Sequence, residues 1–478
     1  MFRQIITGLI LTACLGAGLG YAHAQDGAEP AGQTDAVEHE WPDRLAGHGG
    51  PVKSVVLSED GTRALTASFD YTVILWALEG EEGRIIHRLD GHKAAANDVA
   101  FVPGTEKAVS VGDDGALAIW DLDEGALIKL IEDTGEKALD VAVSLDGTLA
   151  AVARWDGTAR LFDLGEGREV DRLAGHSGNV NAVAFSQDGL ELYTGGYDGR
   201  ILVWPIADGR VSGPSRVLHE AGWGVNVLAA LPGASLLAFG TINGEAGVTD
   251  LETGDTAILK DGDHPVLALA TSPRAGTFAV GTADGEIDVF DVETGAVIES
   301  YGDLFGPVWG LSFTPEGDQL YRAGLDDHAI RWQVSPNQPF QRTQSVYPRR
   351  FQAYDVDDPG EREFLRKCSV CHTLTTDDAN RAGPTLYGLF GRKAGTVEGY
   401  TYSEALKNSD IVWNAETVGR LFDDGPDVVT PGTKMPIQRL KSVERRDALI
   451  EYLARATAPD GDNTRTNERR DGAGGETE

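Results

Sequence analysis

Two cysteines and a histidine near the C-terminal end of the chain form its most informative chemical motif. Cys368, Cys371 and His372 are spaced as Cys-x-x-Cys-His. The cysteine pair alone could be a disulfide or a redox-active dithiol. With histidine as the next residue, the spacing is instead the one that attaches haem c: both thiols add to vinyl groups and the imidazole reaches the iron. The motif predicts one covalent haem c, with His372 as an axial ligand.

A second axial ligand must come from a donor side chain in a loop that faces the haem. Met435 is the only methionine besides Met1, and prolines at 431 and 436 stiffen a segment without helical periodicity. We therefore predict that Met435 binds the iron opposite His372. A histidine–methionine pair raises the reduction potential and fills both axial positions. The predicted chemistry is outer-sphere transfer of single electrons, so the chain is expected to be an electron carrier rather than an enzyme.

Two helices are expected to position these residues. Asp358 and Pro359 occupy the cap and first-turn positions of a helix that leads into the cysteine motif. Gly360 and Phe364 lie four residues apart, on one face of that helix. Near the end of the domain, residues 443–456 repeat apolar side chains at helical spacing. The sequence thus predicts one helix before the motif and one after the methionine loop.

Residues 358–458 resemble a class I c-type cytochrome of the mitochondrial type. Five motifs carry the resemblance in the family's order: Gly383-Pro384, GLFGRK at 388–393, Tyr400-Thr401-Tyr402, Trp413, and PGTKM at 431–435. The resemblance implies an all-α domain. It also implies that Gly360 and Phe364 cross the last helix at Leu449 and Tyr452.

The same resemblance implies roles around the haem. The Pro384 carbonyl should accept the second ring proton of His372, which orients the ligand. Arg392, Tyr402 and Trp413 should hold or screen the propionates, although simple core packing is the alternative for the two aromatic residues. One departure from the family concerns the docking surface, since the acidic run 423–427 precedes the ligand loop. Another concerns tuning of the potential, because Leu421 stands where relatives place a tyrosine under the haem.

An internal repeat fills the chain before this domain. An Asp or Asn in a turn recurs at spacings of 44, 42, 42, 45, 41 and 42 residues, and an aromatic residue follows six positions later in six of the seven units. A second turn in each unit gives four short strands per repeat. The recurring turn residues are Asp70, Asp114, Asp156, Asp198, Asn243, Asp284 and Asp326.

This repeat resembles the WD-repeat β-propeller, with seven blades over residues 40–336. The outer strand of the last blade is missing after Trp332, so the segment from Trp41 to Leu45 should supply it and close the ring. The resemblance implies that His48, Asp70 and Trp76, with their counterparts in blades two and four, form buried hydrogen-bond networks. It also implies a rigid platform for protein partners.

The first 24 residues have the features of a secretory signal peptide. Arg3 precedes an uncharged apolar run, and Ala22-His23-Ala24 provides small residues at the cleavage position. The mature chain would then begin at Gln25 in the periplasm, where haem c is attached. The run is short for a bilayer and no second one follows, so no transmembrane segment is expected after removal of the signal. Residues 11–14 also resemble a lipoprotein box, and a lipid anchor on Cys14 is the alternative.

Composition limits the partners. The chain has 478 residues, 41% hydrophobic and 24% charged, and a net charge of −34. These values exclude wholesale disorder and a polytopic membrane protein. The acidic balance argues against binding of nucleic acid, which requires a basic footprint. Residues 41–347 hold 21 Lys+Arg against 47 Asp+Glu, whereas residues 348–458 hold 16 against 17.

The predicted organisation is multidomain: a signal peptide (1–24), a flexible leader (25–39), an all-β propeller (40–336), a linker (337–357), an all-α cytochrome domain (358–458) and a disordered tail (459–478). We expect a periplasmic monohaem electron carrier whose propeller docks a redox protein or membrane respiratory complex. One alternative is an oxidoreductase whose propeller binds a substrate or second cofactor. Another is a haem-based sensor or assembly scaffold.

Overall fold

The computed structural model describes residues 41–335 and 356–458, except for 81–82, 133–135, 273, 275, 303–305, 370, 376–382, 399, 401, 403, 431–432, 434 and 436–438. The predicted signal peptide, leader and tail lie outside the described residues, as does the linker apart from residues 356 and 357. Among the described residues, every helix is too short or too polar to cross a bilayer.

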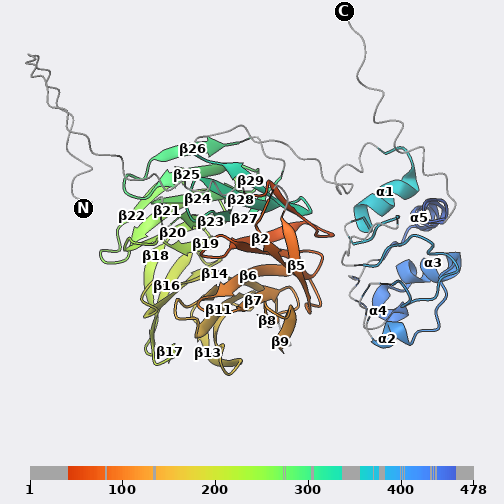
Figure 1. The fold of residues 1–478 in the computed structure, drawn as a ribbon, viewed down its shortest axis with the longest axis horizontal. Coiled ribbons are helices and arrows are strands. Elements are labelled where there is room, and N and C mark those ends of the chain that lie inside the picture. The colour runs from red at the N-terminus through yellow and green to blue at the C-terminus, as the bar shows by residue number, and fades with distance from the viewer. Residues whose placement is uncertain are drawn as a thin grey trace, which may run out of the picture. The chain divides into compact units, whose positions relative to one another are not determined.

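Seven antiparallel sheets make up the first domain (Figure 1). The seven-bladed propeller is therefore confirmed. The strands of blades one to three are β2 (Val52–Leu57), β3 (Arg63–Ser68), β4 (Thr72–Ala77), β5 (Arg84–Asp90), β6 (Ala96–Val102), β7 (Lys107–Gly112), β8 (Leu117–Asp121), β9 (Ala126–Ile131), β10 (Ala138–Val143), β11 (Leu149–Arg154), β12 (Thr158–Asp163) and β13 (Arg168–Ala174).

Blades four to six continue the same order. Their strands are β14 (Val180–Phe185), β15 (Glu191–Gly196), β16 (Arg200–Ala207), β17 (Arg210–Val211), β18 (Arg216–Glu220), β19 (Val225–Ala230), β20 (Leu236–Thr241), β21 (Glu245–Asp250), β22 (Thr256–Asp261), β23 (Val266–Ser272), β24 (Thr277–Thr282), β25 (Ile287–Asp291) and β26 (Val297–Tyr301). In blade four, β17 and β18 both pair with β16.

Blade seven combines the two ends of the propeller sequence. It contains β27 (Val308–Phe313), β28 (Gln319–Gly324) and β29 (His328–Gln333), and its outer strand is β1 (Arg44–Ala46). β1 runs antiparallel to β29, with Arg44 opposite Ile330 and Ala46 opposite His328. The predicted closure by the N-terminal segment is confirmed. Closure covers a sheet edge that would otherwise be open to aggregation.

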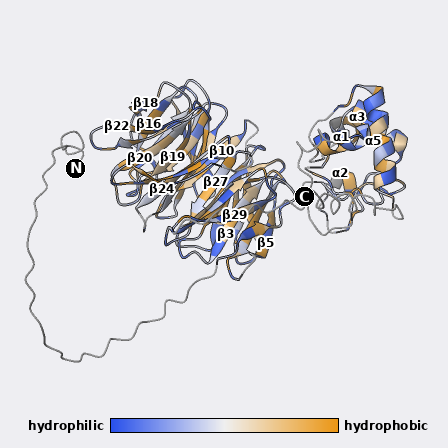
Figure 2. Ribbon diagram, turned by 90° about the horizontal axis from the view of Figure 1, so that it is seen from above, coloured by the Kyte–Doolittle hydropathy of each residue, from blue (hydrophilic) through white to orange (hydrophobic). Residues whose placement is uncertain are grey.

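Strands that are buried along their whole length, such as β4, β11, β20 and β24, build the propeller core. The first strand of each blade contacts the first strands of both neighbouring blades, which completes the ring. Most clusters of buried side chains join residues from two adjacent blades, so the blades stabilise one another rather than folding as separate sheets. Figure 2 shows hydrophobic colouring along many of these strands.

A polar network inside blade one ties the strands together. A ring nitrogen proton of His48 (Nδ1) bonds to the Asp70 carboxylate at 3.0 Å. The Thr66 hydroxyl lies 2.6 Å from the other ring nitrogen and accepts the indole proton of Trp76 at 2.8 Å. Blades two and four repeat this arrangement with His92 and His176. The predicted networks are confirmed, and their hydroxyl members, Thr66, Ser110 and Thr194, were not anticipated.

The remaining described propeller histidines are engaged in separate blades. His87 bonds to a backbone carbonyl, His219 to Thr256, His264 to Asp284 and His328 to Asp327. No group of three or more metal-ligating side chains is found within the described part of the chain.

The C-terminal domain begins and ends with a helix (Figure 1). Its helices are α1 (Pro359–Lys367), α2 (Glu404–Lys407), α3 (Ala415–Asp423), α4 (Pro426–Val429) and α5 (Val443–Ala456). α1 is capped by Asp358, whose carboxylate accepts the backbone protons of Gly360 and Glu361. The two predicted helices, α1 and α5, are confirmed. Both hydrophilic and hydrophobic colours occur on the helices in Figure 2, as expected for amphipathic helices with one buried face.

The crossing of α1 and α5 is close because Gly360 has no side chain. A methyl group at Gly360 would lie 2.1 Å from the Ala448 carbonyl oxygen and 2.5 Å from the Tyr452 Cβ. Phe364 packs on Tyr452 with ring centroids 5.8 Å apart, and Leu449 is fully buried in the same cluster. The predicted contact between the two helices is confirmed.

Candidate haem site

The end of α1 places the cysteine motif at the edge of a cavity. The backbone N–H groups of Cys371 and His372 both donate to the Cys368 carbonyl, at 3.0 and 2.8 Å, so the chain turns tightly after the helix. Cys368 is buried, Cys371 is half-buried, and their sulfurs are thiols rather than a disulfide in the described structure. Burial raises the pKa of the Cys368 thiol to about 12, so that group is neutral at physiological pH.

The imidazole of His372 is held by the loop that follows. Its Nδ1 donates to the Pro384 carbonyl oxygen at 2.7 Å, so the other ring nitrogen keeps its lone pair. Gly383 is packed closely against the ring, since a methyl group there would come within 2.3 to 2.7 Å of three ring atoms. The loop thus fixes both the tautomer and the plane of the imidazole, as second-shell partners do for metal-binding histidines.

The motif and residues from the rest of the domain line a cavity. All eight predicted site residues line it. They are Cys368, Cys371, His372, Pro384, Arg392, Tyr402, Trp413 and Met435. Their roles toward a haem stay predictions, but the structure brings them together around one space.

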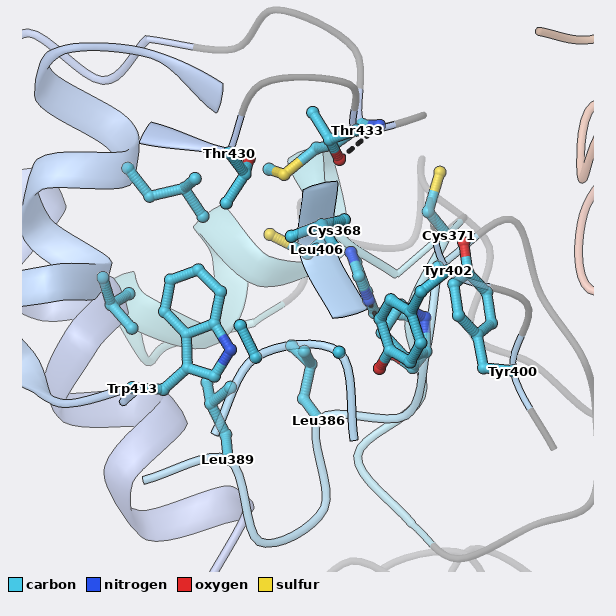
Figure 3. Close-up of a pocket in the computed structure, with 18 of the residues that line it drawn as sticks. Cys368, Cys371, Leu386, Leu389, Tyr400, Tyr402, Leu406, Trp413, Thr430 and Thr433 are labelled. Atoms are coloured by element: carbon cyan, nitrogen blue, oxygen red, sulfur yellow. Dashed lines mark hydrogen bonds between the residues drawn. The ribbon is translucent and has the colours of Figure 1, made fainter. Parts of the chain in front are cut away.

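Apolar side chains form most of the remaining wall. Figure 3 shows Leu386 and Leu389 on one side of the cavity and Thr430 and Thr433 on the other. Thr433 accepts the backbone proton of Met435 at 3.1 Å, and the buried Thr430 hydroxyl donates to the Pro426 carbonyl. Leu421 also lines the cavity, at the position where a tyrosine was expected in relatives.

Arg392 makes contacts that the sequence did not indicate. Its guanidinium donates to the carbonyl oxygens of Tyr387 and Thr385, at 2.6 and 2.8 Å. Burial lowers the pKa of this group without neutralising it. Arg392 therefore fastens the loop that carries Pro384, in addition to bordering the cavity.

Two tyrosines stand side by side at the cavity. Tyr400 and Tyr402 have ring centroids 4.7 Å apart in an edge-to-face arrangement, visible in Figure 3. Burial raises the pKa of both phenols, so both stay protonated and can donate hydrogen bonds at neutral pH. Tyr400 was not predicted as a site residue. Its position two residues before Tyr402 could have indicated that it also borders the cavity.

These residues fit a haem c. Two thiols, an imidazole oriented by the Pro384 carbonyl and a thioether border one apolar cavity. The missing side chain at Gly383 leaves room for the imidazole to lie against its loop. His–Met ligation in an apolar pocket is a known cytochrome arrangement. The chain therefore joins a repeat propeller to a domain whose cavity could hold a haem c.

Comparisons with known proteins agree with both the propeller and the C-terminal domain. The family model "WD domain, G-beta repeat" matches residues 42–77, 83–121 and 167–205. The chain is 43% identical to cytochrome c of Gibberella zeae over 98 residues, which is 20% of this chain and 92% of that protein. It is 44% identical to cytochrome c of Nigella damascena over 101 residues, 21% of this chain and 88% of that protein. Through about a fifth of its length, the chain belongs to the cytochrome c family, which implies haem c binding.

Proposed function

We propose that this chain is a periplasmic, monohaem class I c-type cytochrome that carries single electrons, with an all-α haem domain and a propeller that docks its redox partner. Membership of the cytochrome c family suggests electron transfer, and the WD repeats suggest protein interaction.

The observation that carries the proposal is that the two predicted iron ligands, His372 and Met435, border one cavity. The Nδ1 of His372 donates to the Pro384 carbonyl, which orients the imidazole, and Met435 borders the same cavity. Cys368 and Cys371 would hold the haem through thioethers. When bound, the haem supplies an iron that changes oxidation state by one electron. If His372 and Met435 both bound the iron, they would leave it no position for a substrate.

The other residues of the site would keep the ligand set rigid. Arg392 holds the Thr385 and Tyr387 carbonyls, which steadies the loop next to Pro384. The apolar wall excludes water, and Tyr402 and Trp413 remain the proposed neighbours of the propionates. A rigid, dry site lowers the reorganisation that accompanies a change of charge.

Charge supports the docking role of the propeller. Residues 41–347 hold 47 acidic against 21 basic side chains, so this domain would attract a basic redox protein or a basic face of a membrane respiratory complex. Such attraction raises association rates and weakens with salt, which suits short encounters.

An absorption spectrum of the full, exported protein tests the carrier. We expect one covalent haem per chain and a weak far-red sulfur-to-iron band in the oxidised form. Met435→Ala should abolish that band and lower the reduction potential, whereas Leu386→Ala, a change at another cavity residue, should retain the band. If the band survives in Met435→Ala, or if the reduced wild type binds carbon monoxide rapidly, the predicted iron ligands are wrongly assigned.

Location is tested by cell fractionation. Release of the mature protein with the periplasmic fraction is expected, with Gln25 at its N-terminus. Membrane retention that is lost in Cys14→Ser would favour the lipid anchor instead.

A further inference from the structure

Three large aromatic side chains are exposed on blades three and four. Trp155, Tyr197 and Trp223 are 52%, 56% and 55% exposed, although most large apolar side chains of the propeller are buried. We call these three residues the aromatic patch. Trp155 and Tyr197 each precede the turn aspartate of their repeat, and Trp223 lies between β18 and β19.

The loops that carry the patch are in contact with one another. A methyl group at Gly178 would lie 3.2 Å from the Tyr197 Cβ, and one at Gly224 would lie 3.3 Å from the Tyr197 ring. A methyl group at Gly199 would meet the backbone of Trp223 at 3.1 Å. On the other side, a methyl group at Gly157 would lie 3.1 Å from the Gly178 carbonyl oxygen. The patch therefore spans one continuous series of loops.

Charges beside the patch are unbalanced. Glu136 and Glu220 are exposed, and no salt bridge to either carboxylate is found among the described residues, although Arg154 is close enough to interact electrostatically with Glu136. The cations of the same loops are already engaged: Lys137 binds Asp113 at 2.6 Å and Arg200 binds Asp198 at 2.6 Å. Beside the patch, Asp156 is exposed and pairs with Arg160.

We propose that the aromatic patch is a docking surface for an arginine- or lysine-rich segment of a partner protein, a proposal that rests on the docking role given above and locates it. Aromatic ring faces attract cations, most strongly on tryptophan. Tryptophan and tyrosine are also the side chains that most often dominate binding at interfaces. Glu136 and Glu220 supply the carboxylates that a bound cation needs, and the acidic propeller provides long-range attraction.

Binding of a labelled ten-residue Gly-Arg repeat peptide to the full, haem-loaded protein tests the proposal, with a Gly-Glu repeat as reference. The triple variant Trp155→Ala/Tyr197→Ala/Trp223→Ala should bind the Gly-Arg peptide about tenfold more weakly, which is three contacts at typical exposed cation–π strength. The matched control is Leu145→Ala/Leu190→Ala. The control removes leucine side chains that are 69% and 58% exposed. Both lie in turns that follow β10 and β14, whereas the loops of the aromatic patch lie near the beginning of these strands.

A second variant keeps the aromatic side chains. Glu136→Lys/Glu220→Lys should weaken Gly-Arg binding at least as much as the triple variant, because it places cations beside the patch. If the triple variant binds like the control, or if wild type does not prefer Gly-Arg to Gly-Glu, the proposal is wrong. Haem spectra of all variants should match wild type, so failure of the patch can be told apart from failure of the electron carrier.

Discussion

Replacing Gly360 by alanine should destabilise the haem domain. The added methyl group would lie 2.1 Å from the Ala448 carbonyl oxygen, so α1 and α5 must separate by about 1 Å to restore a normal contact. A gap of that size forfeits a quarter to a half of each dispersion contact in the crossing, including that between Phe364 and Tyr452. Overpacking of this kind costs about 1–3 kcal/mol.

A second glycine provides a control with the opposite expected sign. Gly419 lies within α3, and a methyl group there would be 3.5 Å from its nearest neighbour, Ile450, which is ordinary contact. Gly419→Ala should therefore gain about 0.5–1 kcal/mol from helix propensity. The assay is denaturant unfolding of the haem-loaded protein, followed by haem absorbance and by near-ultraviolet circular dichroism. Equal midpoints for Gly360→Ala and Gly419→Ala would refute the argument from the helix crossing.

Two further predictions concern the propeller. Thr66→Val should lower its unfolding midpoint, because the buried polar groups of His48 and Trp76 both lose their partner, at about 1–3 kcal/mol each; Thr66→Ser keeps the hydroxyl, and equal losses in the two variants would contradict this reasoning. Burial and the nearby Asp98 raise the pKa of Asp140, so its contribution to stability is present at low pH and is lost as pH rises through the folded pKa. The variant Asp140→Asn lacks the titrating carboxyl, so the difference between its free energy of unfolding and that of wild type should shift in favour of the variant as pH rises. If this difference stays constant from pH 4 to pH 8, the Asp140 carboxyl titrates normally and the reasoning is wrong.

Most of the propeller could be predicted from the sequence because its pattern repeats. Turn residues at intervals of 41 to 45 positions indicated seven blades, and the missing strand after Trp332 indicated closure by β1. The hydroxyl groups of the blade networks were missed. Each stands four residues before its aspartate, as Thr66 does before Asp70, so the signal was present.

The sequence predicted the haem ligands more completely than the contacts of the residues around them. Cys368, His372 and Met435 follow from residue chemistry and spacing, and they border one cavity. The bonds from Arg392 to loop carbonyls depend on the path of residues 384–387, which no local pattern specifies. α2 and α4 have four residues each, too few to show helical periodicity.

The pairing of β1 with β29 makes the propeller sensitive to where its leading end is cut. A protease that cleaves before Trp41 leaves in place both the outer strand and the buried Trp41 and Pro42, whose carbonyl accepts the Tyr321 hydroxyl. One that cleaves after Ala46 takes the outer strand from blade seven and exposes the edge of β29. Arg331 donates to the backbone carbonyl and the carboxylate of Asp43, which secures this junction. Two cleavage sites only a few residues apart thus have different results: one leaves the ring closed, and the other opens it and makes self-association more favourable.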